Sequence, residues 1–308
     1  MAVEEFNMQH TTLYRKKVSL NMRHLFPYLI ILPGLIFYLL FTVYPIYSQF
    51  QISFLHWVVT PGAVSPFVGL ANYIQAFHDP VVLVAARNTA LYIIATVPPQ
   101  MILGMIAAYL LVTKIPGAAI WRAAIFLPVI TSWVVVSYLF SYLFNSQEGL
   151  VNGALSVLLH KDIVIPWLQD TWTANGVIWL LAVWKGIGWS MVVFLAAFMN
   201  LPKDQIESAR VDGASSLRVW WHVILPSLRP VITFVFVMLV IGGTQAFISI
   251  FLMTQGGPAN STQVMLTYSY QQAFVFFNFS YAAAIASIMA VLTFGLSVLF
   301  IRVLRERG

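Results

Sequence analysis

The chain has 308 residues, of which 60% are hydrophobic and only 8% are charged. Soluble globular domains carry about 25% charged residues, so a chain this poor in charge must place most of its surface in lipid. The net charge of +6 does not indicate nucleic-acid binding, because the basic residues are spread between apolar segments and form no patch with interleaved aromatic residues.

The N-terminal region consists of a basic tail, which includes Arg15, Lys16 and Lys17, and a long apolar run. The run is longer than the apolar region of a signal peptide, about 7–15 residues, and no cleavage site of small residues follows it. We therefore expect residues 1–25 to form a tail and residues 26–50 to form a first membrane span that is not cleaved.

Six segments are apolar over the roughly 20 residues that a helix needs to cross a bilayer core. They are residues 26–50, 90–112, 120–144, 177–199, 231–253 and 281–303. Proline and glycine residues inside them, such as Pro128 and Gly243, are tolerated in a membrane bundle, where neighbouring helices or cavity water satisfy the freed backbone groups. The sequence thus predicts an all-α membrane protein with six transmembrane helices.

The distribution of basic residues predicts the orientation of these spans. Thirteen of the sixteen lysine and arginine residues lie near the two chain ends, at the connection between the second and third spans, and in the loop 201–229. The exceptions are Arg87, Lys161 and Lys185. Because lysine and arginine are retained on the cytoplasmic side, we expect both termini to be cytoplasmic, including the short tail 304–308.

Three long connections then face outward. They are residues 51–89, 145–176 and 254–280, and the last has no charged residue. Outer loops rich in aromatic and turn residues suit a docking rim for a partner, but tryptophan and tyrosine are also common at the level of the lipid headgroups. Both interpretations stay open from the residues alone.

Catalytic motifs are missing from the sequence. It has no phosphate-binding G-x-x-x-x-G-K-[S/T] loop, no H-E-x-x-H zinc motif and no cysteine that would supply a thiolate metal ligand. Ion-coupled transporters place carboxylates or histidines within the membrane, whereas the only charged residue well inside a span here is Lys185. We therefore expect no enzyme activity, no cofactor and no metal site in this chain, and we expect another protein to drive transport.

The predicted cytoplasmic loop, residues 201–229, has the most informative pattern. Asp204 is expected to cap a short helix, and Gly213 permits a sharp turn that ends it. A second amphipathic stretch follows, and Leu225-Pro226 is expected to stop it before the fifth span. The pattern predicts a knob of two short helices across a glycine elbow. The alternative is a helix that lies on the bilayer surface, which the two tryptophans of the second stretch would suit.

This loop resembles the signature of permeases from binding-protein-dependent ABC importers, which reads Glu-Ala-Ala, then Gly, then Ile-x-Leu-Pro. The residues at the family's spacing are Glu207, Ala209, Gly213, Leu225 and Pro226, with Ser208 and Val223 in place of an alanine and the isoleucine. In that family the loop couples the permease to an ATPase, and its glutamate enters a cleft of the ATPase beside a basic residue. The resemblance therefore implies a coupling role for Glu207, Ser208, Ala209, Asp212, Gly213, Ala214, Leu225 and Pro226.

Other segments are similar to the carbohydrate-type permeases of this family. They are residues 42–46 in the first span, residues 67–73 in the first outer loop, and Arg87-Asn88-Thr89 at the second span. The loop Gly256-Gly257-Pro258 resembles the subgroup of lactose, multiple-sugar and glycerol-3-phosphate permeases, where it is typical of the first of two unlike permease chains. The resemblance covers nearly the whole chain, residues 25–305.

The resemblance implies a type-I importer permease fold, with residues 86–303 as the permease core, and transport by alternating access. The implied partners are a second permease chain in a heterodimer, an ATPase dimer that binds ATP and Mg²⁺, and an extracytoplasmic solute-binding protein that docks near Gly256, Gly257 and Pro258. The implied location is the plasma membrane of a prokaryote, and the implied solute is carbohydrate-like. A permease for amino acids or peptides and an ion-coupled sugar transporter are the alternatives.

Solute contacts are expected from polar or aromatic residues that face the path instead of lipid. The candidates are Trp184, Lys185 and Trp189 in the fourth span and Thr244 and Gln245 in the fifth, followed by Tyr138, Tyr142 and Asn200 near span ends. Trp189 follows Lys185 by four residues and so lies on the same helix face, where an ammonium beside an indole would suit a sugar or a phosphate. Alternatively, Lys185 pairs with a backbone carbonyl or extends towards the interface.

Overall fold

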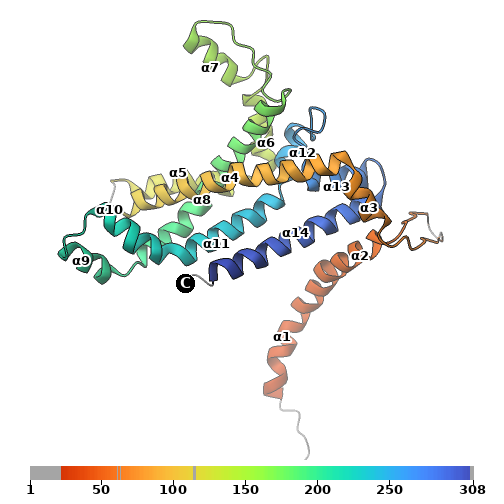
Figure 1. Ribbon diagram of the computed structural model, residues 1–308, viewed down its shortest axis with the longest axis horizontal. Coiled ribbons are helices and arrows are strands. Elements are labelled where there is room, and N and C mark those ends of the chain that lie inside the picture. Colours follow the sequence, from red (N-terminus) through yellow and green to blue (C-terminus); the bar gives the residue numbers. More distant parts are fainter. Residues whose placement is uncertain (1–21, 61, 63, 114–115, 306–308) are drawn as a thin grey trace, which may run out of the picture. The chain divides into compact units, whose positions relative to one another are not determined.

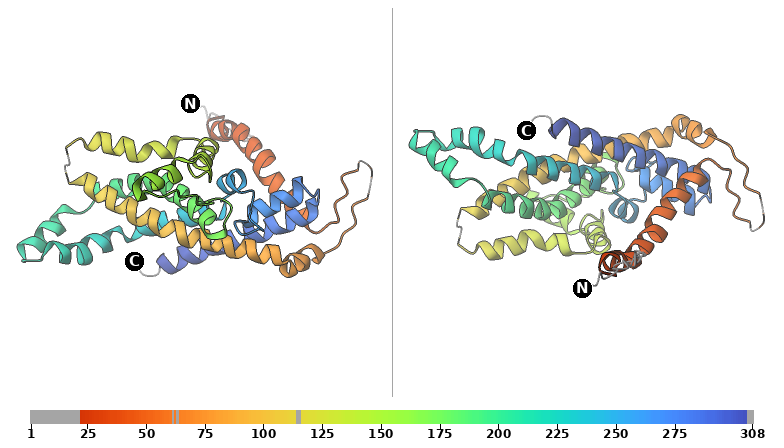
Figure 2. Two further views of the ribbon diagram at one scale, coloured as in Figure 1. Left: turned by 90° about the horizontal axis from the view of Figure 1, so that it is seen from above. Right: turned by 90° about the horizontal axis from the view of Figure 1, so that it is seen from below.

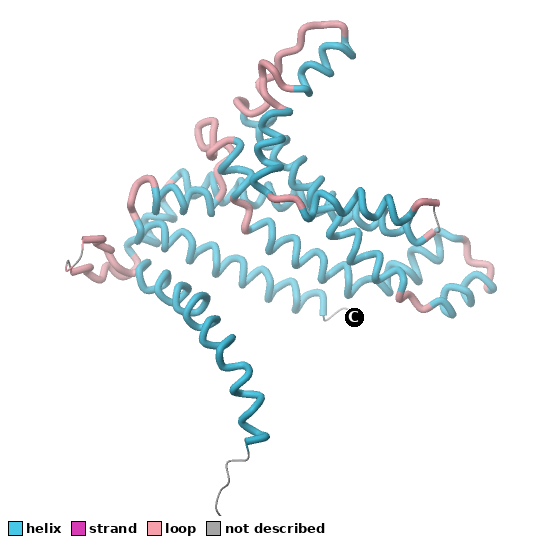
Figure 3. Tube along the Cα trace, turned by 180° about the vertical axis from the view of Figure 1, so that it is seen from behind, coloured by secondary structure: helices cyan, strands magenta, loops and turns pink. Residues whose placement is uncertain are grey.

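The computed structural model describes residues 22–60, 62, 64–113 and 116–305, and every regular element in these ranges is a helix. Figure 3 shows the loops lying mainly at the helix ends. Most of the predicted N-terminal tail and the end of the predicted C-terminal tail lie outside the described residues. The chain divides into two units, Met1–Ser48 and Gln49–Gly308, and each is described by itself.

The first unit is an apolar helix with one wide turn. It consists of α1 (Met22–Tyr38), the π-helical turn η1 (Leu39–Val43) and the start of α2 (Tyr44–Ser53). Its side chains are exposed from residue 27 to residue 47, as those of a lipid-facing helix would be. The wide turn ends at Val43, two residues before Pro45. Its extra width leaves room for the proline ring within a continuous helix. The first predicted span is confirmed as an apolar helical segment over Pro27–Ser53.

Four long helices form the frame of the second unit. They are α4 (Pro80–Val112), α8 (Thr171–Met199), α11 (Leu225–Thr244) and α14 (Phe279–Arg305). Helix α8 packs along α4, and α11 packs against both α4 and α14 (Figures 1 and 2). Each lies in a segment that is long and apolar enough to cross a membrane, so the second, fourth, fifth and sixth predicted spans are confirmed as apolar helical segments.

The third predicted span, residues 120–144, is not one continuous helix. It is divided into α5 (Ala118–Ile130) and α6 (Trp133–Leu143), which are bent by 96° at the break. The hydroxyl of Ser132 accepts the backbone N–H of Val134 at 3.2 Å and so starts a new helix at the break. The described residues therefore contain five apolar spans, or six when this bent pair is counted as one broken span.

The fifth predicted span, residues 231–253, is also interrupted. Helix α11 ends at Thr244, and α12 (Ile248–Met253) follows after a short irregular stretch. The backbone N–H of Gln245 donates to the carbonyl of Gly242 at 3.2 Å, a tight turn of the kind that closes a helix end. The interruption leaves the side chain of Gln245 at a helix end inside an apolar segment.

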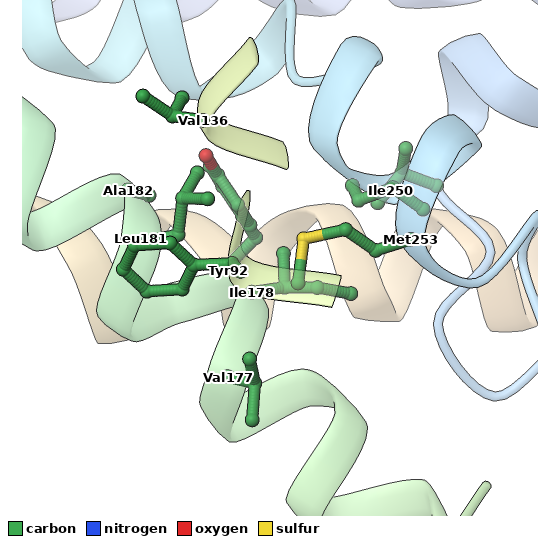
Figure 4. Packing of buried hydrophobic residues seen from close by; sticks show 10 residues of the cluster. Tyr92, Val136, Val177, Ile178, Leu181, Ala182, Ile250 and Met253 are labelled. Carbon is green, nitrogen blue, oxygen red and sulfur yellow. The ribbon is translucent and has the colours of Figure 1, made fainter. Parts of the chain in front are cut away.

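Three clusters of buried apolar side chains hold the second unit together. The first joins α4, α6, α8 and α12, and Figure 4 shows Tyr92, Leu181 and Ile250 converging in it. The second surrounds Phe194, which is fully buried, and joins α8 to α4 and α11. The third joins α4 and α14 to the short helices α3 (Ala71–His78) and α13 (Met265–Phe274). Both broken spans are thus fixed to the frame by packing.

A carboxylate clasp stands at the start of α4. One oxygen of Asp79, Oδ1, accepts the backbone N–H of Val81 at 2.8 Å and caps the helix, which explains why α4 begins at Pro80 and not near residue 90. The other oxygen, Oδ2, accepts the hydroxyls of Tyr268 at 2.8 Å and Tyr281 at 2.7 Å. Asp79 therefore ties α4 to α13 and α14.

The clasp has defined protonation states. Burial raises the pKa of Asp79, but the hydrogen bonds from Tyr281, Tyr268 and two backbone N–H groups outweigh burial and leave that pKa below its ordinary value of 3.8. Burial also raises the pKa of Tyr268 to about 12, helped by its hydrogen bond to Asp79 and by the carboxylate charge. The carboxylate is therefore the acceptor and Tyr268 stays a donor at neutral pH.

We expect Asp79→Asn to lower the free energy of unfolding by about 1.5–3 kcal/mol at neutral pH, because the tyrosines lose a charged acceptor. Since the pKa of Asp79 is lower in the folded protein, its contribution is complete above pH 3.8 and is lost as the pH falls through the folded value. The check is thermal unfolding of the detergent-solubilised protein from pH 7 downwards, with the exposed Asp162→Asn as a matched control. Equal stability of Asp79→Asn and wild type at pH 7 would contradict the clasp.

Candidate functional site

A cavity of about 390 Å³ lies among α4, α8, α11, α12 and the α5–α6 break. Its size falls in the range of small-molecule sites, about 300–1,000 Å³. Side chains that line it include the amides of Gln100 and Gln245, the hydroxyls of Tyr92 and Ser249, and the indoles of Trp133 and Trp189. The two helix breaks therefore contribute to one cavity wall, because Trp133 and Gln245 both follow a helix end.

Three of the five predicted path residues line this cavity: Lys185, Trp189 and Gln245. The other two do not. Trp184 packs its ring 5.7 Å from that of Phe140, and the buried hydroxyl of Thr244 donates to the carbonyl of Ile241 at 2.7 Å.

The three span-end residues also lie outside the cavity lining. Tyr138 and Tyr142 are 59% and 60% exposed, and the side-chain amide of Asn200 donates to the carbonyl of Ala196 at 2.8 Å. These positions fit lipid-facing anchors and a helix end.

The ammonium of Lys185 is held by backbone carbonyls at the α5–α6 break. Its Nζ atom donates to the carbonyls of Pro128 at 2.7 Å, Val129 at 3.3 Å and Thr131 at 2.6 Å. It also lies 5.0 Å from the ring centroid of Trp133, and not beside Trp189 as the spacing of the residues suggested. The structure thus favours the pairing of Lys185 with carbonyls over an indole pair on its own helix.

The amide side chains of the cavity wall are unpaired within the described part of the chain. The side chains of Gln100, Gln245 and Ser249 make no hydrogen bond to any of the residues that the structure describes. A lone amide within an apolar span is a sequence signal for Gln100, although Gln100 was not among the predicted path residues. Trp133 had no such signal, because its place in the wall depends on a helix break that was not expected.

Small residues of α8 bring its neighbours close to the cavity. A Cβ atom on Gly186 would overlap the side chain of Gln100, and one on Gly188 would overlap the carbonyl oxygen of Ile125. A Cβ atom on Gly104 of α4 would lie 2.5 Å from the Cβ of Ser190. These glycines therefore permit backbone approach, as small residues at membrane helix contacts do.

The loop 201–229 forms two short helices across an elbow. They are α9 (Lys203–Val211) and α10 (Ser216–Val219), and the π-helical turn η2 (Trp220–Ile224) follows. Gly213 has a φ angle of 79°, so the elbow uses the backbone conformation that glycine adopts most easily. Trp220 fixes the second helix to the frame, with its ring 4.9 Å from that of Tyr109 and 5.9 Å from that of Phe198.

Two local expectations for this loop were wrong. Asp204 does not cap α9: the helix begins after Pro202, and Asp204 lies in its first turn, where a carboxylate still favours the positive end of the helix dipole. Leu225-Pro226 does not stop the second helix either. The chain continues from α10 through the wide turn η2 into α11, because a widened turn accommodates Pro226 as it does Pro45 in the first unit.

The coupling candidates form an accessible surface. Glu207, Ser208, Asp212 and Gly213 are exposed, whereas Ala209, Ala214, Leu225 and Pro226 are half-buried. Among the described residues, no ion pair or side-chain hydrogen bond involves Glu207. The carboxylate of Glu207 is therefore available to a partner.

The loop with Gly256, Gly257 and Pro258 is held against α4 and α8 by hydrogen bonds from their side chains. The side-chain amide of Asn88 donates to the carbonyls of Ser261 at 2.9 Å and Gln263 at 3.0 Å, and the amide of Asn175 also donates to Ser261. Just after the loop, the hydroxyl of Thr89 accepts the backbone N–H of Met265. Gly256 is buried and has a φ angle of 87°, and a Cβ atom there would overlap the side chain of Gln263.

Only part of this loop is accessible. Gly257 and Pro258 are half-buried, and the exposed positions are Gln255, Ala259 and Asn260. Gly256 therefore shapes the loop without presenting a surface of its own.

Comparisons with known proteins agree with this architecture. Residues 81–307 match the model of the family described as binding-protein-dependent transport system inner membrane component. The lactose transport system permease LacF of Rhizobium radiobacter is 32% identical, with 91% of this chain and 94% of LacF covered. The probable ABC transporter permease YurN of Bacillus subtilis is 31% identical, with 91% of this chain and 96% of YurN covered.

The fold also matches a solved structure. A chain of a bacterial ABC transporter involved in the import of the acidic polysaccharide alginate superposes with a TM-score of 0.78 at 21% identity, covering 92% of this chain and 96% of that chain. Family model, relatives and fold agree with the resemblance carried by Glu207, Gly213 and Pro226. The chain belongs to the family of inner membrane components of binding-protein-dependent transport systems, the permeases of ABC importers.

Proposed function

We propose that this chain moves a carbohydrate-like solute inward by alternating access, as one permease of an ATP-driven importer. The observation that carries the proposal is the cavity between the broken spans, with free amides at Gln100 and Gln245 and indoles at Trp133 and Trp189. A sugar presents apolar C–H faces that stack on aromatic rings and hydroxyls that bond to amides. Relatives named for lactose, arabinooligosaccharides and multiple sugars support this solute class.

On the cytoplasmic side, the loop 201–229 is proposed to dock an ATPase dimer that binds ATP and Mg²⁺. The exposed carboxylate of Glu207 supports this role, since it has no partner among the described residues of its own chain. The half-buried Leu225 and Pro226 sit where the knob joins α11 and transmit its movement into the span that ends at the cavity. Both chain termini are then cytoplasmic, in the plasma membrane of a prokaryote.

On the outer side, a solute-binding protein is proposed to dock on the charge-free loop 254–280. Gly257 and Pro258 with the exposed Ala259 and Asn260 would form the contact, and Gly256 would hold its shape. The anchoring of this loop by Asn88 supports a rigid docking element, because a preorganised surface loses less entropy on binding. A second, unlike permease chain would complete the path.

The test is uptake by proteoliposomes that contain the full importer and its binding protein. Radiolabelled lactose, raffinose and arabinotriose are compared with leucine and dileucine, with and without ATP on the ATPase side. We expect accumulation of at least one saccharide only with ATP. Uptake of leucine or dileucine alone would favour the amino-acid alternative, and saccharide uptake driven by a proton gradient without ATP would favour a secondary transporter.

A further inference from the structure

Among the described residues that line the cavity, Lys185 alone has a charged side chain, and its N–H donors are already used. An ammonium has three N–H bonds and no acceptor, and those of Lys185 reach the carbonyls of Pro128, Val129 and Thr131. The side chain is only 5% exposed. A solute that entered the cavity would therefore meet an ammonium whose hydrogen bonds are complete.

These carbonyls belong to the end of α5, and this position matters for the charge. The last carbonyls of a helix have no partner within it and form the negative end of the helix dipole. Lys185 from α8 satisfies them from across the bundle, and the face of Trp133 adds a cation–π contact at 5.0 Å. The positive charge and the negative helix end thus compensate each other at the α5–α6 break.

An anionic solute would have to draw the ammonium away from this arrangement. Doing so would take the donor away from the half-buried carbonyls of Val129 and Thr131, whereas the carbonyl of Pro128 would still accept the hydroxyl of Thr131. A polar group that loses its partner inside a protein costs free energy. Among the lining residues, all of which the structure describes, no other side chain carries a charge. An uncharged solute needs no such rearrangement, because the amides of Gln100 and Gln245 are free.

We propose that Lys185 is a positioning residue that holds the α5–α6 break and the ring of Trp133, and that the cavity accepts uncharged saccharides and excludes anionic ones such as sugar phosphates and uronates. The inference rests on the proposed function and narrows its solute class. Lys185 then affects transport by holding the cavity wall in place and not by a bond to the solute.

The first test reads the charge of the cavity without any solute. The chain has no cysteine, so Ala246→Cys places one thiol in the cavity wall and Ala259→Cys places one on the exposed, charge-free loop. In the detergent-solubilised importer, each thiol reacts with the anionic sulfonatoethyl methanethiosulfonate and with the neutral methyl methanethiosulfonate. The anionic-to-neutral rate ratio in the cavity is expected to stay within about threefold of the ratio at the loop, because a compensated charge produces little field.

An uncompensated ammonium would give a different result. For a thiol that comes within about 6 Å of it, at an effective dielectric constant of about 20, it would raise the anionic-to-neutral ratio about 100-fold. A ratio of that size would overturn the inference. This outcome does not depend on whether any saccharide is transported.

The second test separates positioning from solute contact. Uptake of lactose and of lactobionate, its carboxylate analogue, is measured in proteoliposomes with wild type, Lys185→Met, Lys185→Arg and the exposed control Lys161→Met. We expect wild type to take up lactose and reject lactobionate, and Lys185→Met to lower the maximal rate at least tenfold with little change in KM. Lys185→Arg should restore part of the rate, and Lys161→Met should match wild type.

Comparable KM values for both solutes in wild type, with a selective rise for lactobionate in Lys185→Met, would overturn the inference while leaving the importer function intact. Failure to take up either solute would count against the proposed function for lactose-like sugars, and the thiol ratio would still decide the state of Lys185. If Lys185→Met does not assemble, the wild-type thiol ratio and the wild-type preference between the two solutes decide whether the inference holds.

Discussion

Replacing Glu207 with alanine is expected to uncouple ATP hydrolysis from uptake while leaving the helices of this chain intact. Glu207 is exposed on α9, and no described residue of its own chain pairs with it. If its carboxylate meets a basic residue in a partly desolvated ATPase cleft, the loss of one partner costs about 2–5 kcal/mol. That corresponds to a fall in affinity of about 30-fold or more.

The measurement is retention of the ATPase through purification of the importer, followed by hydrolysis stimulated by the binding protein. Glu148→Ala removes another exposed carboxylate, from the predicted outer side, and should behave as wild type. Full retention and full stimulation in Glu207→Ala would remove this carboxylate from the coupling mechanism.

Substitutions at the elbow residue Gly213 test the same coupling to the ATPase. Gly213 has a φ angle of 79° and open space around it, so a substitution there acts through the backbone and not through a clash. A β-branched residue disfavours this conformation most, and Gly213→Val should therefore reduce ATPase retention more than Gly213→Ala does. Equal retention in the two variants would show that the elbow is not under conformational constraint.

The sequence predicted the helices and the family but not the helix breaks. Pro98 and Pro99 lie inside α4 without interrupting it, whereas the chain turns by 96° just after Pro128. Two features distinguish the second site. Ser132 caps the helix that follows the break, and the distant residue Lys185 supplies the donors that satisfy the carbonyls there. A contact between positions more than fifty residues apart is not encoded in local periodicity.

The sequence also predicted the candidate path residues only in part. Lys185 and Gln245 line the cavity, whereas their chain neighbours Trp184 and Thr244 do not. Adjacent residues in a helix point about 100° apart, so one of two neighbours can line a cavity while the other packs elsewhere. The sequence indicated the correct stretch of each helix. Which side chains of that stretch face the cavity depends on how the helix is rotated about its axis, and packing decides that rotation.

The loop 201–229 was easier to predict because its information is local. The positive φ angle of Gly213 follows from a glycine between two amphipathic stretches, and the structure contains that elbow. The errors there concern single turns: Pro202 starts α9 in place of an Asp204 cap, and a π-helical turn admits Pro226. Both errors involve proline, whose effect depends on the turn in which it stands.

The contact between α5 and α8 leads to the largest expected effect on stability. Gly188 lies where the two backbones approach: an added Cβ would overlap the carbonyl oxygen of Ile125 and lie 2.8 Å from Cγ2 of Val129 and 3.0 Å from Cα of Phe126. Two of these atoms belong to the backbone and cannot move alone. We therefore expect Gly188→Ala to lower the free energy of unfolding by about 2 kcal/mol or more, as overpacking does, despite the higher helix propensity of alanine.

Gly176 on the same helix provides the matched control, because no atom lies within 4 Å of the position that its Cβ would occupy. Gly176→Ala should raise stability by up to about 1 kcal/mol, since only the helix propensity changes. Thermal unfolding of the detergent-solubilised variants separates the two substitutions by opposite signs. Gly188→Ala should also move α5 away from Lys185 and so slow lactose uptake, whereas Gly176→Ala should leave uptake unchanged. Equal stability of the two variants would mean that α5 yields freely, and then the hydrogen bonds of Lys185 could not hold the cavity wall in one position.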